Sequence, residues 1–187
     1  STVGASAFLE VAEALDELGV SSIDATVSSG EEGVIEADLS IMVGGNHDLV
    51  ERHRPILEEV GTVTRIGDRG AGQVAKIANA MITGANLVVI AETFTFIEQC
   101  GVDPERVYEA IKNGAAQSWE MDNRAPWILE ETFEPGFPGC YHYKDMRLAV
   151  NDAQESNAPV PVASAVHEMF KTQEQVGFGD LDESAVY

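Results

Sequence analysis

The feature that most constrains the fold is a long apolar stretch, VAKIANAMITGANLVVIAETFTFIEQC, which covers residues 74–100. Gly84 is the one strong helix breaker within it, and the helical pattern stops only at Gly101. A helix that is apolar on most sides buries those sides inside a protein. The sequence therefore predicts one long, largely buried helix in the second part of the chain.

Before this helix the sequence alternates between helical and strand-like patterns. Apolar residues recur at helical spacing in two segments, and three short β-prone runs lie beside them. Asn46 stands at a preferred helix N-cap position, and Pro55 is expected to kink or divide the helix that follows. The expected order is helix, strand, strand, helix and strand, over residues 5–18, 20–27, 39–45, 47–60 and 62–67. This order predicts a small α/β unit.

After the long helix only helical patterns follow. Asp103 and Pro104 form an N-cap and a first helical position. Further helical stretches are expected over residues 117–131, 141–157 and 160–176. We therefore place a domain boundary near residue 69, with an α/β domain over 1–69 and an all-helical domain over 70–187.

A polar stripe runs along the start of the long helix. Its members lie at i, i+3, i+7 and i+10, which places them on one side of the helix: Lys76, Asn79, Thr83 and Asn86. No further charged residue follows Lys76 until Glu92. The ammonium therefore meets a partner inside the protein, points into a cavity that takes a ligand, or reaches water at the helix end.

Two glycines, Gly70 and Gly72, precede this stripe. Glycine lets a backbone approach a ligand closely, and the unpaired N–H groups of a helix N-terminus favour negative charge. The glycines therefore favour a ligand near Lys76.

The charge balance limits the partners of the chain. With 32 acidic and 11 basic side chains, the net charge is −21, so nucleic acid and anionic membrane surfaces should repel it. The acids are spread over every segment, which fits either a protein adapted to high salt or an acidic mesophilic protein. We expect no membrane span and no signal sequence, and hence a cytoplasmic protein.

The cysteines and histidines do not predict a metal site. Cys100 and Cys140 lack CxxC spacing, which indicates reduced, buried thiols. The four histidines lie in different elements without ligand spacing, and His142 is expected to be a solvated loop residue without a role.

Several motifs occur together in a fixed order along essentially the whole chain. They are IDATVSSG, IMVGG, IGDRGAGQVAKIANA, NGAAQSW, EPGF with YKDMRLA, and GFGDLDESAV. In these motifs the chain resembles the β-hydroxyacid dehydrogenases, which include 3-hydroxyisobutyrate dehydrogenase and tartronate semialdehyde reductase. The resemblance implies part of a Rossmann-type nucleotide-binding domain, followed by an all-helical domain with one long central helix that carries the active-site lysine.

The resemblance also implies roles for individual residues. Lys76 matches the catalytic lysine, which acts as general acid and base, and Asn79 matches the substrate-binding asparagine. The substrate loop of the family, commonly D-A-P-V-S-G-G, corresponds to residues 24–30. Its last three residues would hold the substrate carboxylate: Ser28, Ser29 and Gly30.

This loop departs from the family pattern at two positions. Thr26 replaces proline and Ser29 replaces glycine, which changes the stiffness of the loop and its permitted backbone angles. The two changes either alter the substrate or are tolerated drift in a loop.

The implied cofactor is NAD or NADP, and the implied substrate is a small 3-hydroxy acid or its semialdehyde. Thr2 matches a threonine beside the nicotinamide, and Lys144 matches a lysine that reaches the cofactor, with Asp145 orienting it. A surface salt bridge between Lys144 and Asp145 is the simpler alternative. The resemblance further implies a homodimer or homotetramer.

The G-x-G-x-x-G turn of dinucleotide-binding domains is missing from this sequence. We expect a fragment of a complete dehydrogenase, inactive on its own. The alternative is a natural short form without cofactor binding that serves as a helical dimerisation or binding module. Imine reductases usually replace the lysine, and 6-phosphogluconate dehydrogenases carry a histidine where Ala78 stands, so both relatives fit less well.

Overall fold

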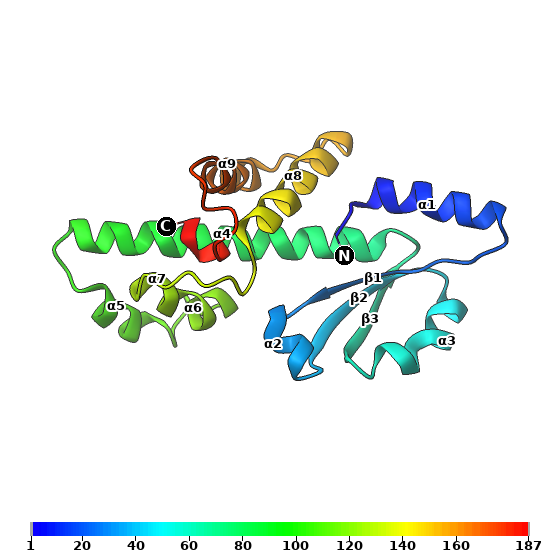
Figure 1. Cartoon of the computed structure of the whole chain (residues 1–187), viewed down its shortest axis with the longest axis horizontal. Helices are drawn as coiled ribbons and strands as arrows, with labels where there is room; N and C mark the ends of the chain where they lie inside the picture. The colour runs from blue at the N-terminus through cyan, green and yellow to red at the C-terminus, as the bar shows by residue number, and fades with distance from the viewer. Residues whose placement is uncertain (1, 187) are drawn as a thin grey trace. The chain divides into compact units, whose positions relative to one another are not determined.

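The computed structural model describes residues 2–186. They form two compact units that share one long helix, α4 (Ala71–Gln99), as Figure 1 shows. Unit 1 contains the chain up to Asn79 together with Gln154–Ser156, and unit 2 contains the remainder. The domain boundary near residue 69 stays a prediction.

Unit 1 is built on a small mixed sheet. Its elements before α4 are α1 (Ala5–Glu17), β1 (Asp24–Ser28), α2 (Gly30–Ile35), β2 (Leu39–Gly44), α3 (His47–Leu57) and β3 (Gly61–Gly67). Strand β2 lies in the middle, antiparallel to β1 and parallel to β3. In this register Asp24 lies opposite Gly44, and Leu39 lies opposite Gly61.

The core of unit 1 lies between the sheet and α3. Alternate residues of β2 point to one face and are buried, namely Leu39, Ile41 and Val43, where they pack with Val50 of α3 and Val63 of β3. This alternation is the period-2 pattern of a strand with one covered face. In Figure 1, α1 and α3 lie on opposite sides of the sheet.

Most of the predicted elements of unit 1 are present. Asn46 caps α3 as expected, since its side chain accepts hydrogen bonds from the N–H groups of Asp48 and Leu49. Pro55 was expected to kink or divide this helix. It does not divide the helix, because it lies in the last turn and α3 ends two residues later. A kink at Pro55 stays a prediction. Helix α2 was not predicted, since GEEGVI has two glycines and no apolar period.

The regular elements of unit 2 in its described residues are helices, with one isolated β-bridge between Pro138 and Asp182. Its elements after α4 are α5 (Pro104–Ile111), α6 (Trp119–Asn123), α7 (Ala125–Leu129), α8 (Gly139–Glu155), α9 (Pro161–Gln175) and the 3-10 turn η1 (Glu183–Val186). Asp103 caps α5 as predicted. The expected single helix over 117–131 is instead α6 and α7, because Pro126 cannot donate the backbone hydrogen bond that a continuous helix needs.

The core of unit 2 forms around the second half of α4. Leu87, Ile90 and Phe94 are buried against Met146 of α8 and Phe170 of α9. One side of α4 is not covered, however. Three apolar residues at intervals of seven, which we call the exposed stripe, are 64%, 54% and 67% exposed: Ile82, Val89 and Phe96. The expectation of a largely buried helix was therefore wrong on this side.

Helix α4 is long and apolar enough to cross a membrane by length and composition, but core helices of soluble proteins pass the same test, so this finding does not overturn the expectation of no membrane span. The expectation for the cysteines does need correction. Cys100 is exposed because it directly follows the last residue of α4, and Cys140 is half-buried, so neither is the buried thiol expected. Both cysteines are free.

Candidate active site

Lys76 and Asn79 lie on the first turns of α4, and both are half-buried. Their spacing of three residues places them on the same side of the helix. The amide oxygen of Asn79 accepts a hydrogen bond from the hydroxyl of Ser28, at 3.1 Å. The structure therefore brings together two of the predicted substrate residues, which are 51 positions apart in sequence.

The rest of the predicted polar stripe finds partners inside the protein. The hydroxyl of Thr83 donates to the carbonyl of Ala80 at 3.3 Å, and the amide of Asn86 donates to the buried carboxylate of Glu120 at 3.2 Å. Burial raises the pKa of Glu120, and the hydrogen bond from Asn86 offsets part of this effect.

The predicted substrate loop ends where β1 meets α2: Ser28 is the last residue of β1, Ser29 is the connection and Gly30 is the first residue of α2, and the backbone here is unusual. Ser29 has a φ of 109° and Gly30 a φ of 65°. A positive φ suits glycine but strains a residue with a Cβ atom. The family glycine that Ser29 replaces would adopt this backbone without strain. Gly33 of α2 accommodates the change, since a Cβ at Gly33 would lie 2.5 Å from the Cβ of Ser29.

The N-terminus of α4 is already occupied by a carboxylate of the protein. Asp24, which is buried, accepts hydrogen bonds from the N–H groups of Gly70 and Gln73, each at 2.8 Å. A Cβ at Gly72 would lie 2.6 Å from the carbonyl of Met42. The expectation that these glycines admit a ligand is therefore not supported: they let α4 start against the sheet, and the anion they favour is Asp24.

Thr26 ties the same strand to α4 by a second contact. Its buried hydroxyl donates to the carbonyl of Gly72 at 2.7 Å. In an α-helix that carbonyl also accepts the N–H of the residue four positions later, which is Lys76. Proline, the common family residue, could not make this bond, so Thr26 adds a link between the substrate loop and the lysine-bearing turn.

Thr2 lies beside the start of α4. The side-chain oxygen of Gln73 accepts hydrogen bonds from the N–H groups of Val3, at 3.0 Å, and Gly4, at 3.2 Å. Because Gln73 is bonded to Asp24 through its own N–H, one residue connects the Thr2 segment, β1 and α4. Sequence reasoning missed this role of Gln73, since its partners are about 70 positions away.

Lys144 belongs to α8 in unit 2. Its ammonium lies 2.8 Å from the carboxylate of Asp145, and its side chain is 39% exposed while that of Asp145 is 4% exposed. The expected contact between these neighbours is therefore present. A cofactor contact of Lys144 stays a prediction.

His142 is buried in α8, not solvated in a loop as expected, and it is 2% exposed. Its Nδ1 is hydrogen-bonded to the carboxylate of Glu183, and its Nε2 lies 3.1 Å from the carbonyl oxygen of Ala80. Burial acts to lower the pKa of His142, but the charge and hydrogen bond of Glu183, the carbonyl of Ala80 and the charge of Asp145 outweigh it and raise the pKa.

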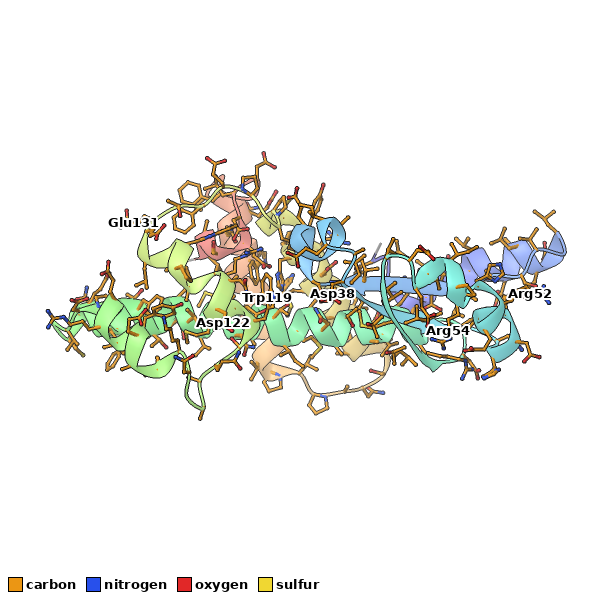
Figure 2. All side chains as sticks on the ribbon, turned by 90° about the horizontal axis from the view of Figure 1, so that it is seen from below. Asp38, Arg52, Arg54, Trp119, Asp122 and Glu131 are labelled. Atoms are coloured by element: carbon orange, nitrogen blue, oxygen red, sulfur yellow. The ribbon has the colours of Figure 1, made fainter. Side chains whose placement is uncertain are left out.

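A second buried ion group lies next to this histidine. The guanidinium of Arg124 is 1% exposed and lies between the rings of Trp119 and Trp127, with Asp182 at 3.6 Å. Trp119, labelled in Figure 2, is 40% exposed, so it covers the arginine instead of filling a core position. The sequence predicted neither Arg124 nor Asp182, because their pairing depends on the tertiary fold.

Two family models match the chain. Residues 1–91 match the NAD binding domain of 6-phosphogluconate dehydrogenase, and residues 70–187 match the NAD-binding domain of NADP-dependent 3-hydroxyisobutyrate dehydrogenase. Among curated relatives, 2-hydroxy-3-oxopropionate reductase of Escherichia coli is 37% identical over 94% of this chain and 60% of its own length. The 2-(hydroxymethyl)glutarate dehydrogenase of Eubacterium barkeri is 32% identical over 100% of this chain and 62% of its own.

Solved structures support the same grouping. A 3-hydroxyisobutyrate dehydrogenase of Salmonella typhimurium superimposes on the whole chain with a TM-score of 0.92 and 29% identity, and the match covers 66% of that structure. An imine reductase of Bacillus cereus, at a TM-score of 0.51 and 14% identity, shares the fold only. The chain spans about 60% of the length of the curated relatives it matches.

Proposed function

Because this chain belongs to the β-hydroxyacid dehydrogenase family, we propose that it serves an oxidoreductase that transfers hydride between NAD or NADP and a small 3-hydroxy acid or its semialdehyde. The observation that carries the proposal is the hydrogen bond between Ser28 and Asn79, on the same helical face as Lys76. It joins the substrate loop to the lysine-bearing helix with the residues that the family pattern requires.

The residues at the start of α4 fit a nicotinamide cofactor. Gln73 fixes the backbone next to Thr2, and it lies within one helical turn of Lys76. Thr2 and, from unit 2, Lys144 would hold the cofactor. When bound, the nicotinamide supplies the hydride acceptor or donor. In this proposal residues 1–69 are part of the nucleotide-binding domain and residues 70–187 form the substrate domain.

Ser28, Ser29 and Gly30 would hold the substrate carboxylate. For this the hydroxyl of Ser28, which donates to the Asn79 oxygen in the structure, would turn its single proton to the substrate. The amide N–H groups of Asn79 can meet other acceptors in either arrangement. Asn79 would donate one of them to the reacting oxygen of the substrate. Fixing the carboxylate at one end and this oxygen at the other orients the reacting carbon.

Lys76 would act as the general acid and base. It would donate a proton to the carbonyl oxygen as the aldehyde is reduced and take it back as the alcohol is oxidised. Asp24 and Thr26 hold the turn that carries Lys76 through contacts with Gly70, Gln73 and Gly72. Their role is to keep the lysine at a fixed position relative to the substrate loop.

The proposal is tested by Lys76→Ala in the full-length gene product, with a panel of small hydroxy acids and nicotinamide absorbance as the signal. We expect turnover to fall by about 10²–10⁴, the usual contribution of a positioned acid–base group. Lys171→Ala is the matched control, because Lys171 is a half-buried α9 lysine whose ammonium pairs with Glu168 of its own helix. Near-normal turnover in Lys76→Ala would remove this residue from the reaction.

We propose in addition that the protein is a homodimer or homotetramer that pairs through the exposed stripe of α4. Ile82, Val89 and Phe96 repeat every seven residues, the interval at which two like helices can pack along one seam. Val89→Glu should then produce monomers in light scattering, while Glu92→Gln, at an exposed polar position beside it, should not. An unchanged mass in Val89→Glu would exclude the stripe as the contact.

The same stripe supports the second candidate, a helical dimerisation module without catalysis. Cofactor binding separates the two functions: calorimetry should show NAD or NADP binding for a dehydrogenase and none for a module. We also propose a cytoplasmic location without nucleic acid or membrane partners, which cell fractionation would test. Recovery with the membrane fraction would contradict it.

A further inference from the structure

His142 occupies a notch on α4 that Gly84 creates. A Cβ at Gly84 would lie 2.5 Å from the Nε2 of His142, so any larger residue would push the ring away. On its other side the ring stacks on Phe170, with centroids 4.3 Å apart and planes within 5°. The histidine is therefore held between α4 and α9 in one orientation.

The two hydrogen bonds of His142 lead to different elements. Nε2 faces the carbonyl of Ala80, which can only accept, so Nε2 carries a proton and donates. Nδ1 bonds to Glu183 of η1. The ring thus links η1 to α4, and Glu183 lies beside Asp182, which accepts from the N–H and hydroxyl groups of Ser184.

Ala80 directly follows Asn79 in the same helix. In a regular α-helix its own N–H donates to the carbonyl of Lys76, four residues earlier. The peptide group that follows Asn79 is therefore bonded to the Lys76 turn through the N–H of Ala80. The next peptide group along the helix is bonded to His142 through the carbonyl of Ala80. A shift at this carbonyl would move the side chain of Asn79.

We propose that His142 is a positioning residue, which holds the turn of α4 bearing Lys76 and Asn79 and connects it to η1 through Glu183. The catalytic part of this inference rests on the proposed dehydrogenase function. The mechanical part, the restraint on α4, does not depend on it. A residue that only filled the core would stabilise the fold without a specific effect on this turn.

Two substitutions separate the two bonds of the ring. The amide nitrogen of glutamine can reach the position of Nε2, and that of asparagine the position of Nδ1. His142→Gln therefore keeps a donor for Ala80, and His142→Asn keeps a donor for Glu183. Each variant retains one bond, so we expect similar melting temperatures. His47→Gln and His47→Asn are the controls, because His47 lies at an exposed position on α3.

The first measurement is hydrogen exchange of the full-length protein, without substrate, over the peptide that covers residues 76–90. We expect exchange in His142→Asn to rise about tenfold, the factor of one lost hydrogen bond, and His142→Gln to stay near wild type. Equal exchange rates in the two variants would contradict the proposal that His142 restrains this turn of α4. If both His142 variants fail to fold, Glu183→Gln tests the same link, and wild-type exchange there would overturn the connection to η1.

The second measurement is KM against kcat for the hydroxy acid that the wild-type protein turns over best. His142→Asn should raise KM several-fold more than His142→Gln does, because Asn79 binds substrate. Equal KM values would overturn the catalytic role even if exchange differs. A wild-type protein without any turnover would reject the proposed function, while the exchange result would still decide the restraint.

Discussion

Asp24 shows how much a single buried carboxylate can organise. It accepts from two N–H groups at the start of α4 and begins the strand that leads to Ser28. Helix N-termini favour negative charge, and here the charge comes from the sheet. The residue therefore sets the distance between the substrate loop and Lys76 without taking part in the proposed reaction.

Asp24→Ala should lower the free energy of unfolding by about 3 kcal/mol, because it removes two charge-assisted hydrogen bonds and leaves two buried N–H groups unpaired. Asp24→Asn keeps one acceptor and should cost clearly less. Urea denaturation of both variants provides the measurement. A loss below about 0.5 kcal/mol in Asp24→Ala, the range of surface substitutions, would show that the cap is dispensable.

At the level of single residues, sequence reasoning could predict placement where the signal was local. The common helix of Lys76 and Asn79 follows from their spacing, and the contact of Ser28 with that helix follows from a motif, while the roles of these residues stay predictions. Asp24, Gln73 and His142 escaped it because their partners lie between 41 and 70 positions away. The sequence does not show whether a histidine is buried or solvated, because this depends on the tertiary fold.

At the scale of elements, one glycine in the middle of α4 weakens the helix for the sake of a neighbouring side chain. Gly84 lies in the middle of the helix, where glycine costs about 1 kcal/mol relative to alanine. A larger residue does not fit at this position, because its Cβ would overlap the ring of His142. Exposed Ala78, one and a half turns earlier, has no such neighbour among the contacts described.

Gly84→Ala should therefore destabilise the protein by about 1–3 kcal/mol, the usual cost of overpacking, despite the gain in helix propensity. Ala78→Gly is the matched control, and it should cost about 1 kcal/mol through propensity alone. Thermal and urea unfolding would measure both. If Gly84→Ala is more stable than wild type, the ring is free to move aside.

Helix and strand positions followed from periodicity, with errors where the period was short or broken. Helix α2 was missed because it has only six residues, two of which are glycine. Pro126 divided the expected helix into α6 and α7. The apolar run of α4 indicated its length but not its exposed side. When a helix is apolar on every side, its sequence does not predict which side packs against the core.

At the scale of the whole molecule, pH should act through the buried groups of unit 2. The folded pKa of His142 lies above its ordinary value, so the stability it contributes is complete below about pH 6.5 and is lost as pH rises through the folded pKa. The pKa of Glu120 is also raised in the folded protein, so the stability that this group contributes falls as pH rises above about 4.5.

The protein should consequently unfold at a higher urea concentration at pH 6 than at pH 9. His142→Gln should flatten this dependence, since glutamine does not titrate. The carboxylates that act on the charge of the ring are Glu183, Asp145 and Glu120, and all of them are buried. Greater stability at pH 9 would mean that His142 is neutral in the folded protein.

Salt should act through the net charge of −21. Repulsion among the acids favours expansion, and salt screens it within a Debye length of about 3 Å at 1 M. We expect the melting temperature to rise with KCl. A melting temperature independent of KCl would favour the acidic mesophilic protein over one adapted to high salt, the choice that composition left open.

Unit 1 is not one continuous piece of chain, because residues 154–156 belong to it and the hydroxyl of Ser6 lies 3.3 Å from the carboxylate of Glu155. A ribosome releases Lys76 and the substrate loop long before it releases Glu155. At about 5–20 residues per second, the delay is roughly 4–16 s. During that time the nascent chain presents the turn with Lys76 in an unfinished unit, which chaperones and proteases could reach.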